Sequence, residues 1–168
     1  MRLERTTTLA VLCTGLLLRA HPSTASDGAL AARLRPAADA ILTGPAPGVK
    51  HDPTKPLTEV VEILSNAAGQ AGWPAAVRSK LTAAHERLKS GGTAFDPGVT
   101  GGLGEAYQSL NGRRFAFPTG VTTFAEAKEA CRREVESSIA ALNAGRMDEA
   151  ARRLLEFLML VMTPLEEQ

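Results

Sequence analysis

The sequence predicts an all-α fold, an antiparallel bundle of four main helices plus a short extra helix, with connecting loops rich in glycine and proline. Three observations favour this class. Apolar residues recur at spacings of three and four through most of the chain, which is the period of an amphipathic helix. Strict alternation, the pattern of a half-buried strand, does not extend beyond a few residues. Glycine and proline separate the periodic segments.

The size and composition indicate one globular domain. The chain has 168 residues, of which 44% are hydrophobic and 22% charged. A formal net charge of +1 gives no electrostatic argument for a nucleic-acid partner. No apolar run approaches the roughly 20 residues that a membrane helix needs. We therefore expect a single helical domain over residues 26–168, without a membrane span.

Two helices are expected at the start of this domain. The first covers about residues 27–43, with Asp27 as its cap. Pro36 lies inside it and predicts a kink or a restart, because proline lacks the backbone donor. A loop over residues 44–55 follows. The second helix begins at Pro56, since proline suits a first helical turn.

The middle of the chain contains one more amphipathic helix, over about residues 74–90, after a short connection at 70–73. Residues 91–104 hold six glycines and one proline, and we expect them to form a loop. Residues 105–110 are expected to be the short extra helix. Pro118 then predicts an extended segment before it.

Two helices are expected in the last third. Thr123 and Glu126 have the spacing of a capping box, which predicts a helix from there to about residue 142. The last helix covers about residues 147–162. The short connections at 70–73 and 143–147 favour two antiparallel helical hairpins.

The N-terminus has the three parts of a secretory signal. The first five residues are net basic, residues 9–18 are apolar, and a small-x-small sequence ends at Ala25. We expect cleavage after Ala25 and a periplasmic or secreted protein. Removal of three Arg and one Glu from the 19 basic and 18 acidic residues leaves 16 and 17, so the mature net charge is −1.

The mature chain keeps a single cysteine, Cys131, which has no internal disulfide partner. It lies on the apolar stripe of the helix that starts near Thr123. A cysteine in such a position packs as a small hydrophobic residue. The alternative is a reactive or intermolecular free thiol, which needs exposure and a neighbouring cation.

Three residues are weak candidates for metal ligands: His51, Asp52 and His85. His51 and Asp52 are adjacent in a loop, where a histidine and a carboxylate can share a proton or a metal ion. His85 flanks the apolar stripe of its helix. The sequence contains no His-x-x-x-His, Cys-x-x-Cys or Cys-x-x-Cys-His pattern. No cofactor and no catalytic residue are therefore assigned, and we expect the protein not to be an enzyme.

Charged residues are placed as on solvated helix faces. Three pairs have an acid four residues before a base, which is the favourable order in a helix. They are Glu129–Arg133, Asp148–Arg152 and Glu149–Arg153.

The last helix is the most informative segment, because residues 154–162 contain one polar residue in nine. A helix that is apolar nearly all round lies either at the centre of a core or beneath a partner. In the second case it forms the interface with a protein partner or with another copy of the chain. The candidate contact residues are then Leu154, Leu155, Leu158, Val161 and Met162.

Residues 144–150, with Leu154 and Phe157, resemble the turn and second helix of a tetratricopeptide repeat. Ala116 and Ala150 are separated by the 34-residue period of that family. The pattern departs from the family at residues 117–120, where a second helix is required. We interpret the resemblance as a general helix–turn–helix signal and assign no peptide-binding residues from it.

These observations predict an exported helical protein that serves as a non-catalytic binding or assembly module. An alternative is a helical bundle that holds a metal, a haem or a small apolar ligand between its helices. His51, His85, Cys131 and the methionines are the residues to inspect in that case.

Overall fold

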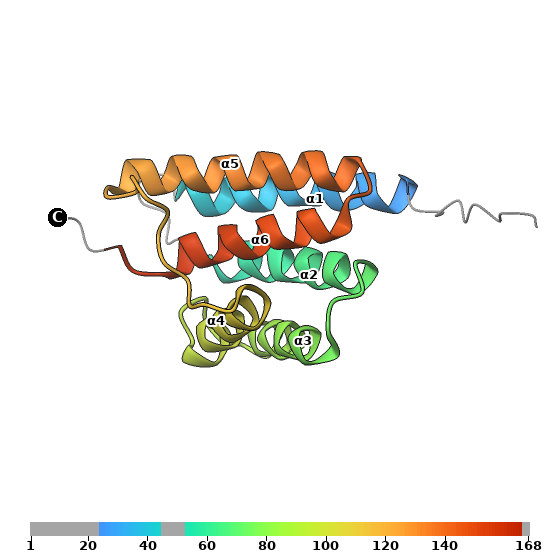
Figure 1. The fold of residues 1–168 in the computed structure, drawn as a ribbon, viewed down its shortest axis with the longest axis horizontal. Coiled ribbons are helices and arrows are strands. Elements are labelled where there is room, and N and C mark those ends of the chain that lie inside the picture. Colours follow the sequence, from blue (N-terminus) through green and yellow to red (C-terminus); the bar gives the residue numbers. More distant parts are fainter. Residues whose placement is uncertain (1–23, 45–52, 166–168) are drawn as a thin grey trace, which may run out of the picture.

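The computed structural model describes residues 24–44 and 53–165, and within these ranges it is all-helical (Figure 1). The all-α prediction is confirmed for this part of the chain. The helices are α1 (Thr24–Thr43), α2 (Thr54–Gln70), α3 (Ala75–Lys89), α4 (Pro97–Asn111), α5 (Phe124–Asn143) and α6 (Met147–Met162). The described residues thus contain six substantial helices. The total of four main helices was wrong, because the segments predicted above already comprise five, and the short extra helix at 105–110 is the second half of α4.

The helices are arranged in three tiers of two (Figure 1). α5 lies beside α1, α6 beside α2, and α4 beside α3. The middle tier joins the other two, because α6 packs against both α5 and α4, and α2 packs against both α1 and α3. α4 and α5 are not in contact with each other in the described chain, so α6 separates them.

The centre of the core is α6. Ten of its sixteen residues are buried, and Phe157, Leu154 and Leu158 are completely inaccessible. This position explains why the segment is apolar nearly all round, since three neighbouring helices cover it. The structure therefore places most of this helix at the centre of the chain's own core, which was the first of the two positions expected for it.

The start of α1 differs from the prediction. The helix begins at Thr24, so Asp27 lies inside its first turn rather than at the cap. Asp27 is buried, and neither of its carboxylate oxygens has a hydrogen-bond partner among the described residues. The helix also continues through Pro36, which is exposed, so the predicted restart there was wrong.

The largest error concerns residues 91–104, because Pro97 to Gly104 form the first half of α4 rather than a loop. Asp96 caps this helix by accepting a hydrogen bond from the backbone N–H of Gly98 at 2.7 Å, and Pro97 occupies the first turn. These are ordinary signals of a helix start. A Cβ at Gly102 would meet the backbone oxygen of Lys80 at 3.6 Å, an ordinary van der Waals distance, so α4 lies directly against α3 at this residue.

The helices α5 and α6 have the cap, the turn and the antiparallel pairing that the sequence predicts. The capping box of α5 is present: the backbone N–H of Glu126 donates to Thr123 Oγ1 at 3.2 Å, and the backbone N–H of Thr123 donates to Glu126 Oε2 at 3.0 Å. Gly145, with a φ of 69°, closes the short turn into α6. α5 and α6 pack side by side and run in opposite directions, as Figure 1 shows.

Candidate functional site

Of the three metal-ligand candidates, the structure describes only His85. His51 and Asp52 lie outside the described residues. His85 is on α3 with a largely buried side chain, and its Nδ1 is 4.0 Å from Glu86 Oε1. Among residues 24–44 and 53–165, no three His, Cys, Asp or Glu side chains are placed to hold a metal ion. No helix within these same ranges is long and apolar enough to cross a membrane.

Cys131 is a free thiol and is buried in α5. Burial raises the pKa of this thiol to about 11, and the charge of Glu134 acts in the same direction. The thiolate is the reactive form of cysteine. Cys131 therefore packs as part of the core in the folded protein.

The apolar residues proposed as contacts are divided by the fold. Leu154, Leu155 and Leu158 are buried inside the chain's own core. Val161 is half-buried, and Met162 is 9% exposed. Both line a hollow at the C-terminal end of α6. Of the five proposed contact residues, only Val161 and Met162 therefore line this hollow.

Two features of the surface remain as candidate sites. The first is a polar cleft of about 380 Å³ whose floor is the outer side of α6 and whose walls are α4 and α5. We call it the α6 cleft. Its lining residues are Leu110 and Asn111 from α4, Glu134 from α5, and Asp148, Glu149, Arg152, Arg153, Leu155 and Glu156 from α6.

Charges in the α6 cleft are paired across helices as well as within them. Arg152 Nε donates to Asp148 at 2.9 Å, which is one of the three ion pairs predicted from the sequence. Arg153 instead reaches across to Glu134 of α5, at 3.3 Å. Glu149 pairs with Arg146 at 2.7 Å. The predicted pair between Glu149 and Arg153 was therefore wrong, because the packing of α5 offers Arg153 another carboxylate.

Trp73 anchors one end of the cleft. Its indole N–H donates to Asp148 Oδ1 at 2.7 Å, and the ring itself is only 4% exposed. The guanidinium carbon of Arg152 lies 5.9 Å from the ring centroid, within the range of a cation–π contact. The turn between α2 and α3 is thereby attached to the first turn of α6.

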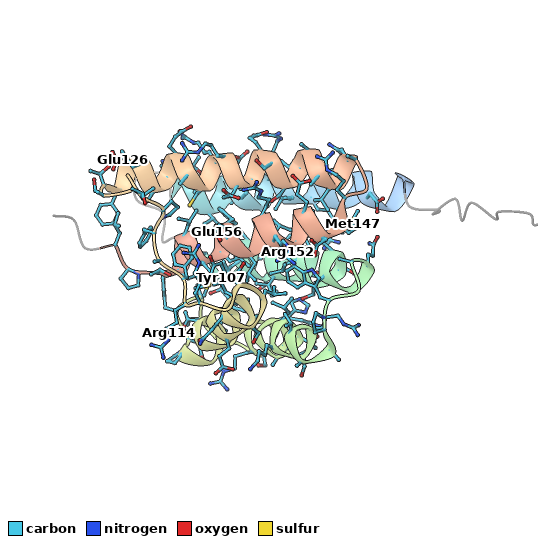
Figure 2. All side chains as sticks on the ribbon, in the orientation of Figure 1. Tyr107, Arg114, Glu126, Met147, Arg152 and Glu156 are labelled. Atoms are coloured by element: carbon cyan, nitrogen blue, oxygen red, sulfur yellow. The ribbon has the colours of Figure 1, made fainter. Side chains whose placement is uncertain are left out.

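Glu156 and Tyr107 meet at the other end (Figure 2). Tyr107 of α4 is buried, and its hydroxyl influences the pKa of the half-buried carboxylate of Glu156. Burial raises the pKa of Glu156, and the negative charge of Glu134 adds to this increase. Burial also raises the pKa of Tyr107. Sequence reasoning missed this pair, because it treated Glu156 only as the polar exception in an apolar helix.

The second feature is an apolar surface at the C-terminal end of α6. We call it the apolar end, and it consists of Phe95, Phe117, Phe124, Val161, Met162 and Leu165. These residues line a hollow of about 340 Å³. The side chains of Phe95 and Phe124 are 69% and 62% exposed, respectively. Such exposure is unusual for a side chain as large and apolar as phenylalanine.

A row of aromatic rings connects the two features. Tyr107 packs edge-to-face on Phe115, with ring centroids 5.5 Å apart, and Phe115 packs in the same way on Phe117. Such contacts are favourable beyond the area that they bury. They hold the connection between α4 and α5 against the domain.

Comparison of the chain with protein-family models, with curated proteins and with solved structures gives no match.

Proposed function

We propose that the protein is an exported, non-catalytic binding or assembly module and that the apolar end binds a partner protein. The observation that carries this proposal is the exposure of Phe95 beside a hollow lined by Val161 and Met162. Exposed apolar patches rimmed by polar residues mark interaction sites, and aromatic side chains supply much of the binding energy at interfaces.

Export is supported by the three-part N-terminus described above. Cleavage after Ala25 removes only the first two residues of α1 and leaves the other five helices intact. The intact mass of the protein recovered from the periplasm or the medium tests this part. We expect the mass of residues 26–168, whereas a chain that keeps Met1 and stays inside the cell contradicts it.

Binding at the apolar end is tested by site-specific photo-crosslinking in the producing cell. The photoreactive amino acid p-benzoylphenylalanine replaces Phe95 in one variant. In the control variant it replaces Ala140, which is exposed on α5 near the end opposite to the apolar end (Figure 1). We expect a discrete adduct at position 95 and none at position 140.

The mass of the adduct shows whether the apolar end contacts another protein or a second copy of the chain. A crosslink to a second copy of the chain supports assembly, and a crosslink to another protein supports binding of a partner. Absence of an adduct at position 95, or equal labelling at both positions, contradicts the proposal. Native mass spectrometry of the Phe95→Ser variant gives an independent readout, since loss of the complex is expected while the fold is retained.

A further inference from the structure

The carboxylate of Asp27, in the first turn of α1, is buried without a hydrogen-bond partner. The residue is 2% exposed, and both carboxylate oxygens lack a donor among the described residues. Within residues 24–44 and 53–165, no other buried side-chain nitrogen or oxygen is left unpaired. A buried carboxylate without a donor is costly, because it has lost the water that solvates its charge. A donor supplied to Asp27 therefore stabilises the fold.

The neighbouring end of α5 has its backbone donors already engaged. α1 and α5 pack side by side and run in opposite directions, so the first turn of α1 lies toward the end of α5 (Figure 1). In the turn after α5, the backbone N–H groups of Ala144, Gly145 and Arg146 donate to carbonyls of α5 itself. The backbone donors closest to Asp27 along the chain are then those of its own helix.

The donors of α1 are occupied as long as residues 24 and 25 belong to the helix. α1 begins at Thr24, so the carbonyls of Thr24 and Ala25 accept from the N–H groups of Gly28 and Ala29 in the regular helical pattern. Cleavage after Ala25 removes both carbonyls. Water hydrolyses the peptide bond, which leaves a carboxylate on Ala25 and an ammonium group on Ser26. The N–H groups of Gly28 and Ala29 then have no carbonyl to bond.

We propose that removal of residues 1–25 makes Asp27 the N-cap of α1, so that processing of the chain stabilises the docking of this helix. An aspartate at the N-cap accepts from the backbone N–H two or three residues later, and two residues later is Ala29. Asp96 does the same at the start of α4, where it accepts from Gly98 at 2.7 Å. The inference rests on the proposed cleavage after Ala25.

The cap satisfies both groups that lack a partner. Asp27 gains a donor, the freed N–H of Ala29 gains an acceptor, and the negative charge stays at the positive end of the helix dipole. Leu30 and Leu34 of α1 are buried in the core, and α1 packs against α2 and α5. The uncut chain keeps an unpaired carboxylate beside this interface. It is therefore easier to unfold than the mature chain, which favours its export before the helix is docked.

Urea unfolding of the uncut chain (residues 1–168) and of the mature chain (residues 26–168) tests the proposal, each with and without Asp27→Ala. We expect Asp27→Ala to lower the folding equilibrium constant of the mature chain about fivefold, as ordinary loss of a cap does. The same change should not lower that of the uncut chain. Asp39→Ala is the matched control, because Asp39 is an exposed carboxylate on the same helix, and its effect should be equal in the two forms.

Both forms are expressed with defined N-termini, so this result does not depend on where the producing cell cleaves the chain. The intact-mass test given above examines that cleavage separately. A chain over residues 22–168 is a second uncut form. It keeps Thr24 and Ala25 but omits the apolar residues 9–18, which can make the full chain insoluble.

Amide hydrogen exchange at Ala29 locates the effect. We expect this amide to exchange more slowly in the mature wild type than in its Asp27→Ala variant. Asp27→Ser should keep the slow exchange, because serine caps a helix about as well as aspartate. An equal loss of stability from Asp27→Ala in cut and uncut chains overturns the proposal, as does no loss in the mature chain. Fast exchange in Asp27→Ser also overturns it, because Asp27 then acts through its charge on the ammonium group of Ser26.

Discussion

Replacement of Asp148 by alanine is the most informative perturbation of the α6 cleft. The carboxylate accepts from the indole N–H of Trp73 at 2.7 Å and from Arg152 Nε at 2.9 Å. It also lies in the first turn of α6, where the helix dipole favours a negative charge. Asp148→Ala removes all three interactions together.

The expected loss of unfolding free energy in Asp148→Ala depends on how deeply Trp73 and Arg152, the two hydrogen-bond donors to Asp148, are buried. Trp73 is 4% exposed, so its N–H loses its acceptor in a buried position, and Asp148 is exposed enough for water to replace part of that bond. This loss costs about 1–2 kcal/mol. The surface pair with Arg152 contributes about 0.3–0.5 kcal/mol, and the helix dipole about 0.3–1 kcal/mol. We expect a decrease of about 2–3 kcal/mol in the free energy of unfolding.

Urea unfolding followed by far-ultraviolet circular dichroism measures this change. Glu149→Ala is the matched control, because Glu149 is in the same turn and forms a surface ion pair with Arg146. It should lose only the dipole and ion-pair contributions, about 0.5–1 kcal/mol. Equal destabilisation by the two variants would refute the structural role of the Trp73 hydrogen bond.

The pH dependence gives a second check on the same residue. The hydrogen bond from Arg152, with a further one from Trp73, lowers the pKa of Asp148 below its ordinary value of 3.8. The ionised form thus stabilises the fold above pH 3.8, and this contribution is lost as the pH falls through the lower pKa of the folded state. The stability difference between wild type and Asp148→Asn should therefore shrink on acidification. A constant difference contradicts the assignment.

Four further predictions follow from single residues. Phe157→Ala should lower the unfolding free energy by about 3–5 kcal/mol, because the side chain is completely buried, and a loss below about 1 kcal/mol contradicts this core position. Gly112→Ala should cost about 1 kcal/mol from backbone strain alone, since φ is 67° and the space for a Cβ is open. Thr123→Ala removes the cap of α5 and should cost about 1 kcal/mol, which thermal unfolding can detect. Cys131, with its raised pKa of about 11, should react with a thiol reagent near neutral pH only after denaturant is added. Rapid labelling of the native protein refutes its buried position.

The helices with strong local signals were predictable from the sequence. α5 and α6 have their predicted bounds because a capping box, an apolar stripe and a closing glycine act within a few residues of each other. α4 was missed because its glycines lower the intrinsic helix propensity. Its start signal at Asp96 and Pro97 and its buried face at Val99 and Leu103 were present, but the density of glycine concealed them.

The candidate sites depended on contacts between residues far apart in the chain. Glu156 meets Tyr107, which is 49 residues earlier, and Trp73 meets Asp148 across 75 residues. No spacing rule within one helix indicates such pairs. The sequence did identify the last helix as exceptional, and the fold shows that most of its apolar residues are buried while Val161 and Met162 line a surface hollow at its C-terminal end.

The sequence by itself determined the all-helical class, the caps of α5 and the apolar character of α6, because hydrogen bonds and side-chain spacing within one helix depend on neighbours three or four residues away. The tertiary structure decided that α6 lies at the centre of three tiers, that glycine-rich α4 is helical against α3, and which carboxylate each arginine contacts. The physical reason is that burial and charge pairing depend on distances between helices, and these are set by packing of the whole chain.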